Sequence, residues 1–180
     1  PFGHRPLGGE LAAPAPVVNL PPITDPACAV VAELLRDPLV PKAGHNIKYD
    51  WQVLRRAGVE LAGVAYDSML TSFVLDPGRR SHAIDTLSLE HLDRGMRQHT
   101  DLAGKGKAQI PFAEVAIPEA AAYCGADSAT VLALHDYFAP ALREHALERL
   151  LGEIELPLVP VLVDMEWDGI AIDRVVFERL

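Results

Sequence analysis

The sequence predicts an α/β fold with a helical C-terminal portion. Two short apolar segments, at residues 39–44 and 64–66, have the length of buried strands, and each precedes a segment with helical spacing of apolar residues. From Pro118 onward the helical pattern dominates. Strands that alternate with helices in one half, followed by helices alone, are typical of an α/β domain with a helical extension.

The composition fits one globular domain with a real core. The chain has 180 residues, of which 49% are apolar, and a formal net charge of −9. This charge argues against binding nucleic acid by bulk attraction alone, although bound divalent cations reverse the local sign in a nuclease. Cys28 and Cys124 form no Cys-x-x-Cys pair, which predicts a reducing compartment and no structural zinc site. The sequence has no signal peptide and no apolar run long enough for a membrane span, so we expect no membrane partner.

Turn and capping residues divide the first half of the chain into its elements. Residues 5–26 are rich in proline and glycine and predict an exposed connection. A helix is expected over 28–36, and Asn46 is expected to cap a second helix over 49–56. Asp67 is expected to cap the helix that follows the second strand.

The second half is predicted to contain several helices and one loop. Asp85 is expected to cap the first of these helices, and Cys124 is expected to be a small core residue. The expected helices cover 85–92, 118–138, 139–151 and 153–168, and the loop covers 100–112.

Two short acidic segments are the strongest functional signal in the chain. They are Asn46-Ile47-Lys48-Tyr49-Asp50 and Tyr123-Cys124-Gly125-Ala126-Asp127. An aspartate in apolar sequence costs free energy unless a cation, hydrogen bonds or a metal ion compensates its charge. Two such aspartates resemble half of a two-metal site for phosphoryl transfer. By spacing alone, each pair is also compatible with a purely structural role, because a tyrosine and an aspartate often share a helix face by chance.

The same two segments resemble the second and third exonuclease motifs of family A DNA polymerases. The intervening sequence at 66–70 and 102–109 is also similar to that family. Residues 155–162 resemble the segment that leads from the exonuclease domain into the polymerase thumb. The resemblance implies a ribonuclease-H-like exonuclease fold that lacks its first strands. It also implies a partial 3′→5′ exonuclease domain over 1–150 and the start of the polymerase domain, a thumb helix, over 151–180.

The resemblance also implies roles for single residues. Asp127 would hold the more tightly bound of two divalent metal ions, and Asp50 would act at the second, largely through water. The ions would be Mg²⁺ or Mn²⁺, with Zn²⁺ as an alternative. Tyr123 would orient the attacking water. The residues expected to contact the terminal nucleotides are His45, Asn46 and Tyr49.

The implied partners are the single-stranded 3′ end of DNA and the rest of a polymerase chain. We expect a monomer in the bacterial cytoplasm, associated with the nucleoid. The reaction would remove mismatched 3′-terminal nucleotides during replication and repair.

One departure from the family pattern bears on activity. The first exonuclease motif, an Asp-x-Glu on the first strand, is absent, and truncation upstream of Pro1 explains this better than mutation. With only Asp50 and Asp127, we expect the chain alone to be inactive or nearly so. Because a ribonuclease-H-like sheet is built around its first strands, we also expect marginal stability and exposed apolar surface.

Two alternative functions stay open. The first is a non-catalytic exonuclease fold that serves as a scaffold for a polymerase, although such domains tend to lose the motif aspartates that this chain keeps. The second is an RNA 3′ exonuclease of the ribonuclease D type, against which the thumb-like segment from Glu155 onward argues.

Overall fold

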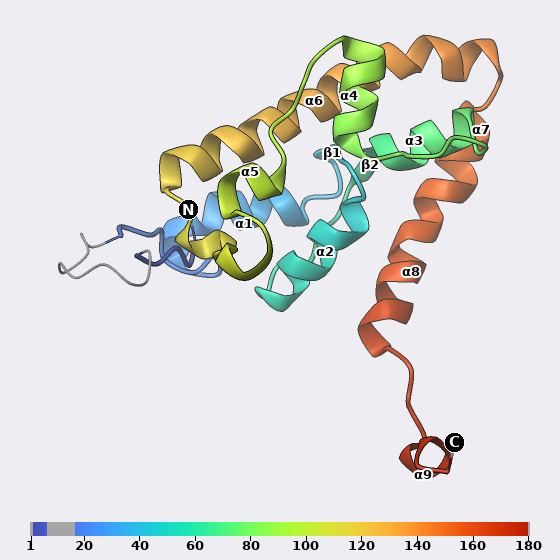
Figure 1. Ribbon diagram of the computed structural model, residues 1–180. Helices are drawn as coiled ribbons and strands as arrows, with labels where there is room; N and C mark the ends of the chain where they lie inside the picture. Colours follow the sequence, from blue (N-terminus) through green and yellow to red (C-terminus); the bar gives the residue numbers. More distant parts are fainter. Residues whose placement is uncertain (1, 7–16, 180) are drawn as a thin grey trace.

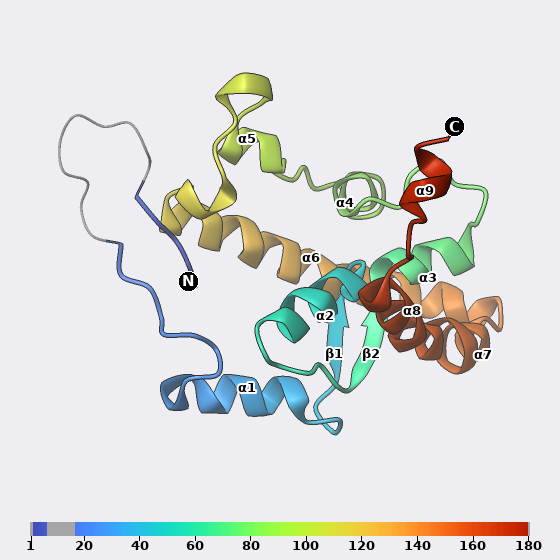
Figure 2. The ribbon, with the colours of Figure 1, turned by 90° about the horizontal axis from the view of Figure 1, so that it is seen from below.

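Two short parallel strands organise the first half of the molecule. The computed structural model describes residues 2–6 and 17–179, so part of the predicted connection over 5–26 lies outside the described residues. Strand β1 (Lys42–Gly44) pairs with β2 (Val64–Asp67), and Gly44 lies opposite Asp67. Helix α2 (Ile47–Arg56) connects them. Within the described residues the sheet has these two strands alone, which confirms a small α/β core (Figure 2).

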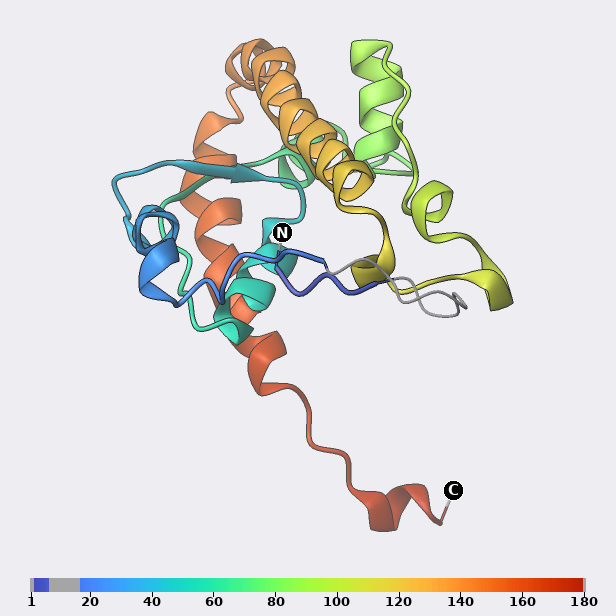
Figure 3. The ribbon, with the colours of Figure 1, turned by 90° about the vertical axis from the view of Figure 1, so that its left-hand side faces the viewer.

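The other elements are helices and single helical turns (Figure 1). The α-helices are α1 (Ala29–Arg36), α3 (Ser68–Leu75), α4 (Ile84–Leu92), α5 (His99–Ala103), α6 (Ile117–Glu144), α7 (Glu148–Leu150), α8 (Leu156–Asp168) and α9 (Arg174–Phe177). The short turns are η1 (Pro26–Cys28), η2 (Gly106–Ala108), η3 (Phe112–Glu114) and the π-turn η4 (Leu151–Glu155). Figure 3 shows α6 on one side of the strands and α2 on the other, with α9 projecting away from the rest.

Asp67 caps two helices at once. Its Oδ1 accepts hydrogen bonds from the backbone N–H groups of Met69 (2.8 Å) and Leu70 (3.1 Å) at the start of α3, which confirms the predicted cap. Its Oδ2 accepts a third bond, from the N–H of Ile47 at the start of α2 (2.7 Å). Asp67 is only 1% exposed, so these three donors replace the water that a carboxylate would otherwise need.

The prediction that Asn46 caps α2 is wrong. Asn46 precedes the helix, but its φ of 55° is left-handed and its side chain makes no capping hydrogen bond. A capping side chain needs extended backbone at the cap position. Here the chain instead turns sharply from β1 into α2 through Asn46, and Asp67 supplies the acceptor from the neighbouring strand.

Three other expectations differ from the structure. The expected loop over 100–112 begins with helix α5, which has a reciprocal capping box between Gln98 and Asp101. The expected helix over 139–151 is interrupted, because α6 ends at Glu144 and Ala146 has a φ of 55°. Asp85 lies inside α4 rather than at its cap, and its carboxylate accepts a hydrogen bond from the Gln98 side chain (2.5 Å).

Helix α8 packs against α2. Ile47 and Leu61 form a buried cluster with Val159 and Val163 of α8. Polar contacts continue this interface toward solvent: Glu166 pairs with Lys48, Asp164 with Arg55 (2.7 Å), and the Arg55 guanidinium lies 4.6 Å from the centre of the Trp167 ring. The helix predicted to begin the polymerase domain therefore supports the helix that carries Asp50.

Helix α1 exposes several apolar side chains. Val30 is 71% exposed, and Val31 and Leu34 are each about half exposed. A second set of apolar side chains extends from α8 into the projecting C-terminal segment, where Ile170 is 93% exposed. None of the helices in the described part of the chain combines the length and the apolarity that a bilayer span requires.

Replacement of Asp67 by alanine should destabilise the chain markedly. One buried N–H group of α2 and two partly buried N–H groups of α3 would lose their acceptor, and we expect the free energy of unfolding to fall by about 3 kcal/mol. Urea unfolding followed by circular dichroism measures the change. The matched control is Asp25→Ala, because Asp25 caps a single N–H, that of Ala27, at an exposed turn. It should cost about 1 kcal/mol or less. Equal losses in the two variants would contradict the double-cap interpretation.

Candidate active site

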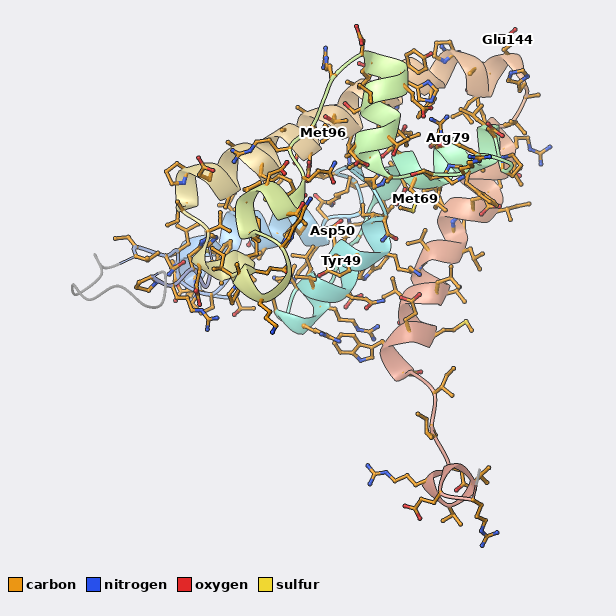
Figure 4. The ribbon with its side chains drawn as sticks, viewed as in Figure 1. Tyr49, Asp50, Met69, Arg79, Met96 and Glu144 are labelled. Carbon is orange, nitrogen blue, oxygen red and sulfur yellow. The ribbon has the colours of Figure 1, made fainter. Side chains whose placement is uncertain are left out.

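The structure brings Asp50 and Asp127 to one pocket. Both line a pocket of about 540 Å³, which we call the larger pocket because it exceeds the neighbouring pocket of about 330 Å³ that Asp127 also lines. Asp50, labelled in Figure 4, comes from the first turn of α2. Asp127 comes from the middle of α6, so the fold joins two helices that are distant in sequence. The other residues that line this pocket are Pro41, Ala43, Gly44, His45, Ile84, Cys124, Ser128, Val131 and Leu132. The pocket thus lies beside β1 and against α6.

Neither of these aspartates has a compensating partner. Within the described residues, Asp50 and Asp127 form no ion pair and accept no hydrogen bond from another residue's side chain. Asp50 is exposed as a residue, yet partial burial of its carboxyl group against the pocket wall raises its pKa, and the nearby Asp67 raises it further. Burial also raises the pKa of Asp127. Both carboxylates would gain from a proton or a cation in the pocket.

Tyr123 lies one helical turn before Asp127, on the side of a second pocket. This smaller pocket, of about 330 Å³, is lined by Tyr123 and Asp127 but not by Asp50. The ring of Tyr123 lies 6.0 Å from that of Phe112, measured between centres. Burial, followed by the charge of Asp127, raises the pKa of the phenol, so Tyr123 is a neutral hydrogen-bond donor at neutral pH. Among Asp50, Tyr123 and Asp127, only Asp127 lines both pockets.

The three residues predicted to contact nucleotides lie at or next to the start of α2. His45 lines the larger pocket, and its Nδ1 is hydrogen-bonded to the Ser68 hydroxyl (2.9 Å). Burial lowers the pKa of His45 despite the nearby Asp67, which favours the neutral imidazole. Asn46 is exposed at the turn, and Tyr49 is 67% exposed on α2. His45 is therefore placed to contact a molecule in the larger pocket, whereas Asn46 and Tyr49 could contact it only from outside the pocket wall.

The carboxylates present fit part of a metal site. Asp50 and Asp127 offer the hard oxygen ligands that Mg²⁺ and Mn²⁺ prefer, and they face one pocket. In the described part of the chain, however, no cluster of three or more His, Cys, Asp or Glu side chains is arranged to hold a metal ion. Asp164 and Glu166 match the letters of an Asp-x-Glu, but they lie on α8 and pair with Arg55 and Lys48. The donor set is therefore incomplete.

The expectation that Cys124 is a core residue is wrong, and the basic pair Arg94 and Arg97 is expected from the sequence only as solvated surface charge. Cys124 is exposed and lines the larger pocket, so it is not a core residue. Although the residue as a whole is exposed, partial burial of its thiol and then the charge of Asp127 raise the pKa of that thiol, which favours the protonated, poorly nucleophilic form. The sequence signal for its place at the pocket was its position three residues before Asp127 on a helix, since residues three apart share a helix face. Arg94 and Arg97 both line the smaller pocket, and the available signal was that the two form one of the local basic pairs of the sequence.

The chain resembles known proteins over most of its length. The family model described as 3'-5' exonuclease matches residues 17–143. DNA polymerase I of Pseudomonas aeruginosa is 40% identical over 152 residues, which cover 83% of this chain and 17% of the relative. DNA polymerase I of Rhizobium leguminosarum is 36% identical over 180 residues, which cover 100% of this chain and 18% of the relative. The chain thus spans less than a fifth of the length of these two curated relatives.

The chain also resembles a solved polymerase structure. The POL domain of Pol1 from M. smegmatis, in a complex with DNA primer-template and dNTP, matches with a TM-score of 0.69 and 29% identity. The match covers 86% of this chain and 24% of that one. The similarity therefore extends to the arrangement of the elements in space.

The uncompensated charge of Asp127 predicts an unusual pH dependence. A raised pKa means that, just above the ordinary value of about 3.9, the folded chain binds more protons than the unfolded chain, so this aspartate lowers stability as the pH rises. Asp127→Asn should therefore unfold at a higher urea concentration than the unmodified chain at pH 7, and the difference should shrink as the pH falls below about 3.9.

The control variant, Asp85→Asn, should change the stability at pH 7 in the opposite direction. A hydrogen bond from Gln98 lowers the pKa of Asp85, so its charge stabilises the fold above the ordinary pKa and is lost on acidification. Asp85→Asn should therefore be less stable than the unmodified chain at pH 7. A loss of stability in both variants would contradict the assignment of Asp127 as an uncompensated charge.

Proposed function

Because the chain belongs to the 3′-5′ exonuclease domain family of family A DNA polymerases, we propose that it supplies the proofreading exonuclease site of a DNA polymerase I. The observation that carries this proposal is the convergence of Asp50 and Asp127 on one pocket, both with raised pKa values and neither with a partner in the described residues. The substrate would be the single-stranded 3′ end of DNA. The polymerase relatives favour DNA over RNA as the substrate.

Hydrolysis of a phosphodiester requires an activated water and neutralisation of charge at phosphorus, which two divalent ions supply when bound. Asp50 and Asp127 would provide two of the carboxylates that hold these ions. Tyr123, a neutral phenol one turn from Asp127, would donate a hydrogen bond that orients the attacking water. His45 would contact the terminal nucleotide in the larger pocket, while Asn46 and Tyr49 would contact it from the rim.

The remaining metal carboxylates would have to come from another strand. In the described residues β1 pairs with β2 on one edge only, and the larger pocket lies beside Ala43 and Gly44 of β1. A strand that carries the Asp-x-Glu of the family pattern would fit this free edge and place its carboxylates next to Asp50 and Asp127. Without them, the 180 residues alone would bind Mg²⁺ or Mn²⁺ weakly and cleave DNA poorly.

We propose that residues 1–150 form the exonuclease part and that 151–180 begin the polymerase part. The end of the family match at residue 143 supports this division. The two parts would meet at a packed junction, because α8 contributes Val159 and Val163 to the cluster that holds α2. The parent polymerase would act as a monomer in the cytoplasm.

A non-catalytic scaffold is the second candidate, favoured by the incomplete donor set at the larger pocket. In that case the fold would serve only to support the polymerase. Mn²⁺ binding distinguishes the two candidates. A polymerase that contains this chain should bind Mn²⁺ at this domain if the site is catalytic, and Asp50→Asn should weaken that binding.

The direct test replaces Asp127 with alanine in a polymerase that contains this chain. We expect degradation of single-stranded DNA from the 3′ end to fall by at least about a hundredfold, because a metal-holding carboxylate acts on the transition state. Primer extension should be unchanged. The matched control is Asp136→Ala, on the same helix, whose side chain is 85% exposed. Undiminished 3′ degradation by the Asp127 variant would refute the assignment.

A further inference from the structure

The smaller pocket lies between α6 and the segment that joins α4 to α5. Tyr123, Ala126, Asp127 and Thr130 line it from α6, and Arg94, Gly95, Met96 and Arg97 line it from the segment. Met96 marks this segment in Figure 4. Because Asp127 lines both pockets, the smaller pocket borders the candidate catalytic aspartate, and Asp50 does not line it.

The two arginines of this pocket differ in their partners. The Arg97 guanidinium pairs with Glu119 at 2.8 Å. Within the described residues, the Arg94 side chain makes no ion pair and no hydrogen bond. Arg94 is therefore the arginine of this pocket with a guanidinium free to bind an anion.

The backbone of Arg94 is fixed even though its side chain is free. Its N–H donates to the carbonyl oxygen of Ser88 (3.2 Å), and the Ser88 hydroxyl donates back to the carbonyl oxygen of Arg94 (2.9 Å). Ser88 lies on α4 and is 0% exposed. Asp93, in the left-handed conformation, turns the chain out of α4 just before Arg94. The two hydrogen bonds thus hold the backbone of Arg94 beside the pocket.

The charge of the chain explains why such a cation would be needed. The net charge is −9, and Asp50 and Asp127 add local negative charge where a phosphodiester would have to lie. A DNA strand approaching Asp127 gains from a fixed cation next to the reacting bond. A guanidinium suits this task because its planar set of donors can bind two phosphate oxygens at once.

We propose that Arg94 binds a backbone phosphate of the substrate strand in the smaller pocket, next to the bond that is cleaved at Asp127. This proposal rests on the proposed exonuclease function and adds a substrate-binding residue to it. Arg94 contributes to binding of the strand, and Asp50, Tyr123 and Asp127 act on the reaction itself.

The test compares Arg94→Ala with Arg94→Lys in a polymerase that contains this chain. Exonuclease rates are measured on a single-stranded oligonucleotide at several salt concentrations. Arg94→Ala should raise KM about tenfold and leave kcat within about twofold, because one charge-assisted contact is lost. The slope of log(kcat/KM) against log[salt] should become shallower by about 0.7, the value for one phosphate contact on a single strand. Arg94→Lys should keep the slope, since the charge remains.

The matched control is Arg149→Ala. Arg149 lies on α7, lines neither pocket, and pairs with Glu153 at 2.8 Å. It should change neither KM nor the salt slope. Unchanged primer extension in all variants shows that the protein is folded.

A second measurement locates the phosphate. Single methylphosphonate groups, which are neutral, are placed one at a time along the oligonucleotide. At the position that Arg94 contacts, neutralisation should raise KM for the unmodified polymerase but not for Arg94→Ala. If the unmodified polymerase is active and Arg94→Ala keeps its KM and salt slope, the role of Arg94 is refuted and the exonuclease function stands. If the unmodified polymerase fails to degrade single-stranded DNA, the proposed function itself is refuted.

Discussion

The buried carboxylate of Asp67 joins the parts of the molecule that form the candidate site. It stands at the end of β2 and accepts N–H groups from the starts of both α2 and α3, which sets the direction of α2 as it leaves β1. Asp50 lies in the first turn of that helix, and His45 lies in the turn before it, bound to Ser68 of α3. The positive ends of two helix dipoles therefore meet at one fixed negative charge, so this location is satisfied and not open to a substrate phosphate.

The acids of this region show how a fold separates structural from functional charge. Asp67 is fully buried and fully hydrogen-bonded, so its charge stabilises the structure. Asp50 and Asp127 line a pocket but receive no hydrogen bond and no ion pair from another side chain of the described residues, and the charge of Asp67 makes ionisation of Asp50 still harder. Carboxylates with raised pKa values and no partner are common in active sites, because natural proteins tolerate a local loss of stability where function needs it. A cation in the pocket would remove the cost.

The sequence was a good guide to local structure and a poorer guide to contacts between distant segments. Apolar spacing predicted both strands and most helices, and Asp67 was identified as a cap from its position before an apolar helix. That Asp67 also caps α2, in place of Asn46, depends on pairing between β1 and β2, which no local pattern contains. The interruption after α6 was hidden because alanine, the residue with the left-handed backbone, is the best helix former. Helical spacing likewise placed Tyr123 and Asp127 on one face, but only the packing of α4, α6 and β1 shows that Asp127 lies between two pockets.

The packing of α8 on α2 has a practical consequence for anyone who excises the nuclease as a separate protein. A cut near residue 150, where we propose that the exonuclease part ends, would remove Val159 and Val163 and leave Ile47 and Leu61 facing water. The helix that carries Asp50 would lose its apolar support together with its ionic contacts to α8. A cut after Asp168, where Gly169 ends the helix, would keep these contacts, so the packing that supports α2 extends a full helix beyond the boundary that we propose in the sequence.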